Sequence, residues 1–180
     1  MREGGDLVSK WVDFYTVSGA AAASLLGLLF VAVSINAAET LGPAAGSSGR
    51  FAEQAFQNYL ATLVISLLSL MPEMPATILG RTLVAVTLSW AFWACIRFYR
   101  SVQSIGDQEY SFTALRRHVA SVAAFAMLLY AASCMSWGDD THRYLIAAAL
   151  VILLSSATFV SWELLLAVAR TRQREEQGES

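Results

Sequence analysis

The sequence predicts an all-α bundle of transmembrane helices, and its composition and the spacing of its apolar segments are the observations that predict it. Of the 180 residues, 56% are hydrophobic and 14% are charged, and the mean hydropathy is +0.52. In soluble domains about a quarter of the residues are charged, and disordered chains are poor in apolar residues, so both classes are excluded. Crossing a bilayer takes roughly 20 apolar residues in a helix. We expect five spans within one transmembrane domain over residues 1–180, at residues 14–36, 51–71, 76–99, 118–137 and 144–169.

The first predicted span, residues 14–36, carries no formal charge. A cleaved signal peptide is the competing interpretation of this segment. However, the acidic residues Glu3, Asp6 and Asp13 precede it, and its apolar run is longer than that of a signal peptide. We therefore expect the first span to be retained.

The second predicted span, residues 51–71, admits two interpretations. Its apolar part, residues 59–71, is too short to cross a bilayer as a helix. Extending it back to Phe51 gives sufficient length and places polar residues on one helical face, namely Glu53, Gln54, Gln57 and Asn58. We predict a span with a polar entry. The alternative is an amphipathic helix on the membrane surface, which leaves four spans.

Turn-forming or charged residues lie before each of the last three predicted spans. Pro72 and Pro75 lie between the second span and the third, where they favour a tight hairpin. Arg116 and Arg117 precede the fourth span, and residues 138–141, Gly-Asp-Asp-Thr, join it to the fifth.

The distribution of Lys and Arg predicts the orientation, because these residues stay on the cytoplasmic side near the ends of spans. With five spans, eight of the twelve gather on one side and three on the other, and Arg81 is assigned to neither. This places the C-terminus inside, with residues 170–180 as a charged cytoplasmic tail, and the N-terminus outside. With four spans the N-terminus is inside as well.

Glu163 is the first candidate functional residue, because it lies about 10 Å of helix before the inner boundary of the fifth span. A lone carboxylate at this depth costs a few kcal/mol unless it is paired, protonated or facing water. Arg97 is its predicted partner. Together with Glu53, Gln57 and Asn36, these residues predict a polar vestibule on the cytoplasmic side. The alternatives are an ion pair that fixes helix register and an ordinary polar turn at the lipid headgroups.

Two further sets of residues suggest contacts between helices. Asp13 and Arg81 can form a charge pair near the outer surface, unless Arg81 extends to the headgroups. Gly19, Ala23 and Gly27 recur at every fourth position and allow a second helix to approach closely. That helix belongs either to the same chain, to a second copy or to another protein, and the pattern does not distinguish these.

Enzymatic and nucleic-acid functions find little support. The net charge of −2 disfavours phosphate binding, and the chain contains no nucleophile elbow, phosphate loop or zinc-protease motif. His118 and His142 fall on opposite sides of the membrane, so they cannot share a metal ion. The polar groups of residues 139–142 are explained by an ordinary turn. We expect no catalytic residue, no cofactor and no metal site.

The start of the chain carries one resemblance to known proteins. Residues 11–15 (WVDFY), Gly19 and residues 27–34 (GLLFVAVS) resemble the start of small multi-pass bacterial membrane proteins of uncharacterised function. The resemblance covers about the first fifth of the chain. It implies a bacterial inner-membrane protein and no particular activity.

These observations lead to one expected function and two alternatives. We expect an oligomeric ion channel or small transporter, because a helical bundle of 19.5 kDa encloses a path most simply between copies of itself. A non-catalytic subunit or regulator of a larger membrane complex would instead dock through Gly19, Ala23 and Gly27. A lipid-acting enzyme would need the polar cluster around Glu53 and Glu163 as its pocket. The expected partners are the lipid bilayer and either a second copy of the chain or another membrane protein.

Overall fold

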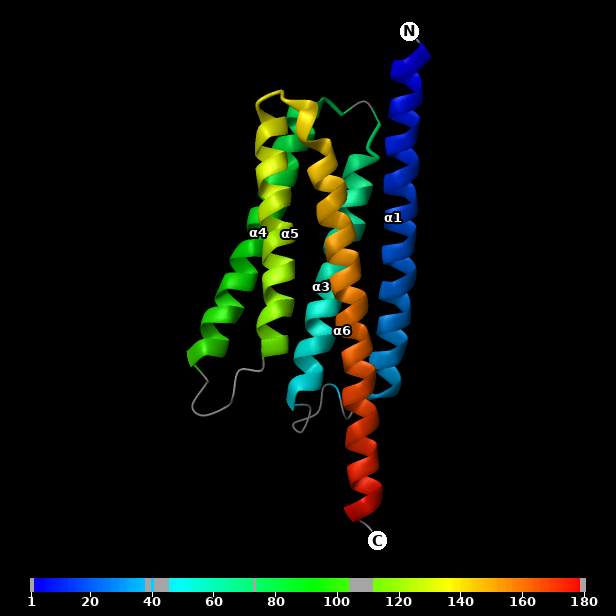
Figure 1. The fold of residues 1–180 in the computed structure, drawn as a ribbon, viewed down its shortest axis with the longest axis vertical. Helices are drawn as coiled ribbons and strands as arrows, with labels where there is room; N and C mark the ends of the chain where they lie inside the picture. Colours follow the sequence, from blue (N-terminus) through cyan, green and yellow to red (C-terminus); the bar gives the residue numbers. More distant parts are fainter. Residues whose placement is uncertain (1, 38–39, 41–45, 73, 104–111, 179–180) are drawn as a thin grey trace. The chain divides into compact units, whose positions relative to one another are not determined.

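The computed structural model describes residues 2–37, 40, 46–72, 74–103 and 112–178, and this part of the chain is helical without a strand. Side chains are described in residues 10–37, 40, 49–72, 74–92, 120–139 and 141–169. Figure 1 shows the α-helices, which are α1 (Arg2–Ile35), α3 (Gly46–Ser69), α4 (Ala76–Gln103), α5 (Phe112–Ser136) and α6 (Arg143–Gly178). A short 3-10 helix, η1 (Asp140–His142), precedes α6. The all-α fold is confirmed, with one helix at each predicted segment.

Local sequence explains where two of the helices begin or end. α4 begins at Ala76, directly after Pro75, whose carbonyl accepts hydrogen bonds from the amides of Ile78 and Leu79 at 3.0 Å. α5 ends at Ser136 and is closed by a glycine in the left-handed conformation, Gly138, with a φ of 89°. The amides of Gly138 and Asp139 donate to the carbonyls of Met135 and Cys134 at 3.0 and 3.2 Å, which is the Schellman arrangement.

Two helices in the described part of the chain are long and apolar enough to cross a membrane. They cover Lys10–Ile35 in α1 and Arg143–Ala169 in α6. The apolar parts of α4 and α5, Ala76–Phe92 and Ala120–Ser136, are shorter. A bundle of five spans therefore stays a prediction.

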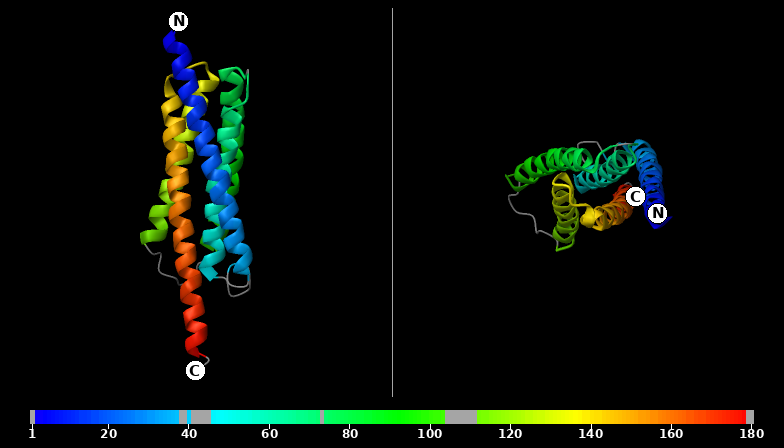
Figure 2. Two further views of the ribbon diagram at one scale, coloured as in Figure 1. Left: turned by 90° about the vertical axis from the view of Figure 1, so that its right-hand side faces the viewer. Right: turned by 90° about the horizontal axis from the view of Figure 1, so that it is seen from above.

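The chain divides into two compact units. Unit 1 comprises Met1–Leu67 and Leu153–Ser180, and unit 2 comprises Leu68–Ile152. Unit 1 thus contains α1, most of α3 and the second part of α6. These three helices lie side by side, with α3 antiparallel to the other two (Figures 1 and 2). Their shared core consists of Leu29 from α1, Ala52, Ala55 and Tyr59 from α3, and Ala157, Val160, Leu164 and Val168 from α6.

Unit 2 contains α4, α5, η1 and the first part of α6. α4 and α5 are antiparallel neighbours whose backbones approach closely at Gly80. A Cβ atom at position 80 would lie 2.5 Å from the Ser136 nitrogen, 2.8 Å from the Met135 carbonyl carbon and 2.9 Å from the Ala132 oxygen. The absence of a side chain at Gly80 therefore permits this contact.

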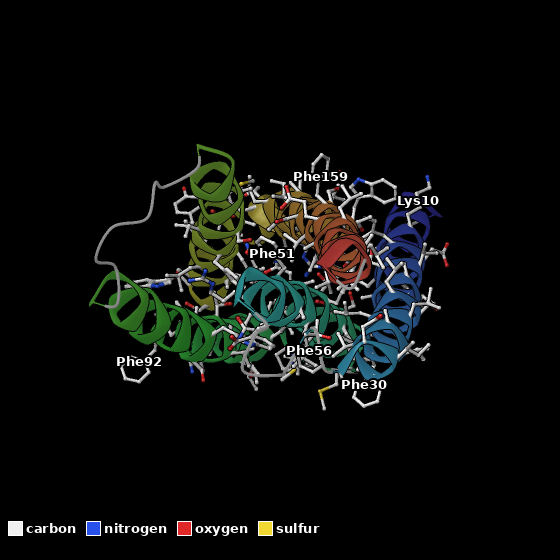
Figure 3. All side chains as sticks on the ribbon, turned by 90° about the horizontal axis from the view of Figure 1, so that it is seen from below. Lys10, Phe30, Phe51, Phe56, Phe92 and Phe159 are labelled. Atoms are coloured by element: carbon white, nitrogen blue, oxygen red, sulfur yellow. The ribbon has the colours of Figure 1, made fainter. Side chains whose placement is uncertain are left out.

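In both units, small side chains are buried and many large apolar side chains are exposed, which is the inverse of the distribution in soluble proteins; we call this the inverted distribution of side-chain sizes. Many buried side chains are small, including Ala22, Ala55, Ala124, Ala132 and Ala157. Large apolar side chains are exposed on every α-helix, among them Phe30 (67%), Leu67 (57%), Phe92 (65%), Val122 (66%) and Phe159 (60%). In Figure 3, Phe30, Phe92 and Phe159 extend away from the helices that carry them. Soluble proteins bury such residues, whereas helices that meet in lipid pack through small ones.

Candidate functional site

A stripe of polar side chains runs along α3 at every fourth residue. It consists of Gln54, Asn58, Thr62 and Ser66, which we call the α3 polar stripe. Gln54 is half-buried, and the other three are buried, with exposed fractions of 2%, 0% and 0%. The fourfold spacing keeps these side chains near one side of the helix over about 18 Å. Polar groups this deeply buried need hydrogen-bond partners.

Asn58 and the adjacent Tyr59 connect α3 to α6. The Asn58 Nδ2 donates to the Ser156 Oγ at 3.5 Å. The Tyr59 hydroxyl donates to the Thr158 Oγ1 at 3.3 Å and lies 3.4 Å from the Ser161 Oγ. These contacts join the two helices within unit 1 through neutral groups.

Most hydroxyl groups around this junction are also bonded to their own helix. Thr62 donates to the Asn58 carbonyl at 2.9 Å, Thr158 to the Leu154 carbonyl at 2.9 Å, and Ser161 to the Ala157 carbonyl at 2.9 Å. Because each hydroxyl has one proton to donate, the protons of Thr158 and Ser161 are already engaged. The junction is therefore a neutral and largely closed hydrogen-bond network.

Ser66 ends the stripe at a close contact with α1. Its Cβ would lie 3.1 Å from a Cβ built on Gly19, and its Oγ 3.8 Å away. The Ser66 Oγ has no hydrogen-bond partner among the described residues. Gly19 thus packs against a helix of the same chain, which is one of the three possibilities that the small-residue pattern leaves open.

Ala23 and Gly27 continue the fourfold spacing of Gly19 along α1 but differ from it in burial. Gly19 is buried, whereas Ala23 and Gly27 are exposed. No described atom lies within 4 Å of a Cβ built on Gly27. The three residues of the predicted ladder therefore do not share one contact inside the chain.

The residues of the predicted cytoplasmic vestibule are distributed over both units. Glu163 and Gln57 are half-buried and Glu53 is exposed, all in unit 1. Asn36 has a local role at the end of α1, because its Nδ2 donates to the Ala32 carbonyl at 2.8 Å and its carbonyl accepts from the Thr40 amide at 2.9 Å. Arg97 belongs to α4 in unit 2, and its side chain lies outside the described residues. The vestibule stays a prediction.

The predicted outer charge pair also stays a prediction. Asp13 and Arg81 are both exposed, and they belong to different units.

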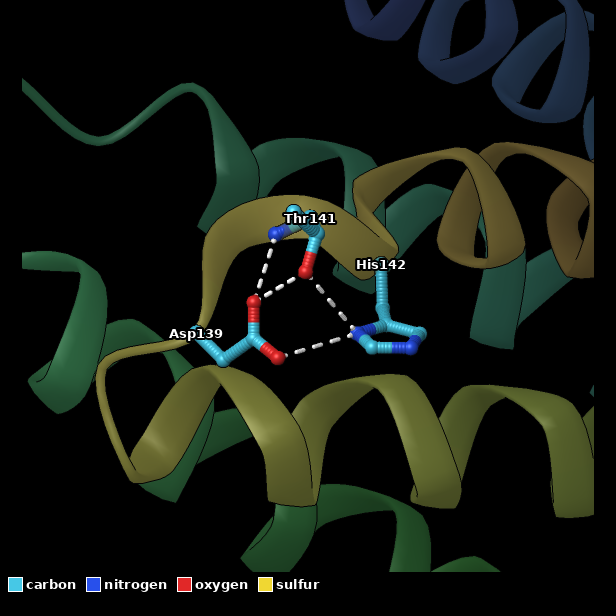
Figure 4. A network of polar contacts seen from close by, with 3 residues as sticks. All are labelled: Asp139, Thr141 and His142. Carbon is cyan, nitrogen blue, oxygen red and sulfur yellow. Dashed lines mark hydrogen bonds and ion pairs between the residues drawn. The ribbon is translucent and has the colours of Figure 1, made fainter.

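The turn between α5 and α6 holds a second group of polar contacts, shown in Figure 4. Asp139 accepts from the Thr141 amide at 3.0 Å and from the Thr141 hydroxyl, and its Oδ2 lies 3.5 Å from the His142 Nδ1. The hydrogen bonds from Thr141 lower the pKa of the Asp139 carboxyl below its ordinary value, and His142 contributes a smaller effect in the same direction. No cluster of three or more potential metal-ligating side chains occurs among the described residues.

The sequence analysis missed the buried end of the α3 polar stripe and its partners on α6. Thr62 and Ser66 continue the fourfold spacing of Gln54 and Asn58, so extending that pattern finds them. Ser156, Thr158 and Ser161 have no comparable signal, because hydroxyl residues are scattered through apolar helices without identifying a partner. Comparisons with protein-family models, with curated proteins and with solved structures find no match for this chain.

Proposed function

We propose that this chain is a multi-pass protein of a bacterial inner membrane, with its C-terminus in the cytoplasm, that assembles into an oligomeric ion channel or small transporter. The membrane location is supported by the inverted distribution of side-chain sizes, with alanines buried and phenylalanines exposed on the same helices. It is supported further by the two helices that are long and apolar enough to cross a bilayer. The orientation and the bacterial membrane rest on the sequence pattern and the resemblance described above.

The observation that carries the transport proposal is the position of Glu163. This carboxylate is half-buried on α6, within one of the two candidate spans. Its neighbours Val160 and Leu164 are buried in the core of unit 1. An acidic group in an apolar span is tolerated where it faces a polar partner or water, and such groups commonly line ion paths. We therefore expect Glu163 to contribute to a path for cations.

The hydrogen-bond network of unit 1 favours a path between copies over a path through one copy. Asn58 and Tyr59 are 2% and 1% exposed, and their polar groups contact hydroxyls of α6. Such a packed junction leaves little room for a hydrated ion. An oligomer in which α6 of each chain presents Glu163 toward its neighbours supplies space outside this packed junction.

Replacement of Glu163 by glutamine tests this proposal. The Glu163→Gln variant keeps the shape of the side chain and removes its charge, so cation flux into proteoliposomes should fall by about tenfold, which corresponds to a loss of about 1.4 kcal/mol of attraction for the cation. Glu163→Asp is the matched control, because it retains the charge and should retain most of the flux. Native mass spectrometry in nanodiscs establishes whether both variants keep the wild-type subunit number. Equal flux in the wild-type protein and the Glu163→Gln variant contradicts the proposed role of Glu163.

A second candidate function, a non-catalytic subunit of a larger membrane complex, is favoured by the exposed side of α1. Gly27 has open space where a side chain would be, and Ala23 is exposed one turn away. A partner helix can approach closely at such positions.

Substitution of Gly27 distinguishes this candidate from the first. Gly27→Leu should release a stoichiometric companion of different mass, whereas Gly27→Ala and Glu163→Gln should leave it bound, as measured by native mass spectrometry. Retention of every companion by the Gly27→Leu variant argues against this function, and a ring of identical chains favours the channel.

A further inference from the structure

The turn between α5 and α6 brings together an imidazole, a carboxylate and a phenol ring. The His142 Nδ1 lies 3.5 Å from the Asp139 Oδ2, and the two side chains are 32% and 51% exposed. The rings of Tyr130, from α5, and His142 are perpendicular to each other, with 5.4 Å between the centroids and an interplanar angle of 89°. His142 therefore touches both the turn and α5, and α6 begins at the next residue.

We propose that Asp139, His142 and Tyr130 form a pH-sensitive clasp that fastens the beginning of α6 to the end of α5 when His142 is protonated. A neutral imidazole carries the Nδ1 hydrogen in only one of its two tautomers, whereas the protonated ring always carries it. Protonation also adds a positive charge next to a carboxylate, which attracts it. Imidazole is the side chain that ordinarily changes charge between pH 5 and 8, so these two pH values are the ones at which to compare the turn.

The hydrogen bonds made by Thr141 keep the clasp ready for a protonated ring. Thr141 donates its amide and its hydroxyl to Asp139, and its Oγ1 lies 3.3 Å from the His142 Nδ1 (Figure 4). The same bonds lower the pKa of Asp139 below its ordinary value. The carboxylate is therefore ionised from pH 5 to 8 and can accept from a protonated ring throughout this range.

The other titratable groups on the adjoining elements set the strength of the clasp. They are Tyr130 and Cys134 on α5, Asp139 and Asp140 in the turn and η1, and Arg143 and Tyr144 at the start of α6; the Asp140 side chain lies outside the described residues. Arg143 is a cation and opposes a second positive charge on its neighbour. The carboxylate of Asp139 favours that charge through direct contact at 3.5 Å. We therefore expect a modest stabilisation, of the size typical of a partly exposed ion pair.

Linkage gives the direction of the pH dependence. The added attraction exists while the imidazole is protonated and is absent when the imidazole is neutral. The turn should therefore be more rigid at pH 5 than at pH 8. The Thr141 amide reports this change directly, because it donates to the Asp139 Oδ1 at 3.0 Å.

Hydrogen exchange of the Thr141 amide, measured by NMR on the full chain in nanodiscs, tests the clasp. Rates are expressed as protection factors, which remove the intrinsic effect of pH on exchange. We expect about twofold greater protection at pH 5 than at pH 8 in the wild-type protein. The His142→Gln variant should give the same protection at both pH values. Replacement of the other histidine, His118→Gln, is the matched control and should retain the wild-type difference.

A second variant keeps the proposal testable if His142→Gln does not fold. Asp139→Asn keeps an oxygen that accepts from Thr141 and removes the charge that attracts the protonated ring, so the pH dependence should disappear while the turn persists. Equal protection at pH 5 and pH 8 in the wild-type protein overturns the proposal, as does a pH dependence that survives in His142→Gln. Neither result depends on whether the protein carries ions.

Discussion

Tyr59 joins two helices with different parts of one side chain. Its ring is buried in the apolar core of unit 1, and its hydroxyl contacts Thr158 and Ser161 on α6. Tyrosine suits such a position because its large apolar body ends in a polar group. The ring and the hydroxyl each contribute to the free energy of unfolding, and two substitutions can measure the two contributions separately.

Tyr59→Phe should have a small effect, and Tyr59→Ala a large one. Removing the hydroxyl should lower the free energy of unfolding by about 0.6 kcal/mol, the average for hydrogen bonds between membrane helices. Thr158 and Ser161 keep their own bonds to backbone carbonyls, so no donor is left unpaired. Removing the ring as well leaves a cavity and should cost about 3 to 5 kcal/mol. Denaturation in detergent micelles, followed by tryptophan fluorescence, measures both, and equal losses would show that the hydroxyl dominates.

The residues around Tyr59 show what the sequence predicts at this scale and what it does not. The common helical face of Gln54, Gln57 and Asn58 was predictable from their spacing. Thr62 and Ser66 continue this spacing, although they were not included in the prediction. The pairing of Tyr59 with hydroxyls about a hundred positions away was not predictable, since a helix pattern shows which residues share a side and not which helix faces them.

At the scale of elements, the glycines of this chain have different roles according to what surrounds them. Gly80 lies against the backbone of α5, Gly19 lies against the Ser66 side chain, and Gly27 has no described neighbour within 4 Å. The sequence pattern singled out Gly19 and Gly27 because of their spacing. The pattern did not identify Gly80, because a close backbone contact depends on which residues the neighbouring helix places there.

Gly80→Ala should therefore destabilise unit 2. The new Cβ would lie 2.5 Å from a backbone nitrogen of α5, so the two helices must separate, at a cost of about 3 kcal/mol. Gly27→Ala is the matched control, because it meets no described atom and gains up to about 1 kcal/mol of helix propensity. The midpoint of thermal unfolding, measured by circular dichroism in detergent, should fall for the first variant alone. An unchanged midpoint for Gly80→Ala would mean that α4 and α5 are farther apart than the structure places them.

The ends of the elements were predictable to different degrees. The helix boundaries at Pro75 and Gly138 were expected from residue types with strong backbone preferences: α4 begins directly after Pro75, and Gly138 follows the end of α5. Several helices are longer than the predicted spans. α1 begins at Arg2, α3 begins at Gly46, and α6 ends at Gly178. Hydropathy marks where a helix stops being apolar, whereas polar residues can continue the same helix into water.

For the whole molecule, the helix content was predictable and the grouping of helices was not. The composition and five apolar segments were sufficient to predict an all-α chain. Helices that are apolar on every side give no amphipathic pattern that identifies the buried side. The division into two units, with α6 contributing to both, therefore had no signal in the sequence. The exposed phenylalanines and buried alanines also become visible only after folding.

The contact at Gly80 has a consequence for genetics. A side chain introduced at Gly19 meets Ser66, and a second mutation that shortens Ser66 to glycine can restore the lost space. A side chain introduced at Gly80 meets backbone atoms of Ala132, Met135 and Ser136, which no substitution at those positions removes. Defects at position 19 should therefore have intragenic suppressors in α3, whereas defects at position 80 should revert mainly at the original codon.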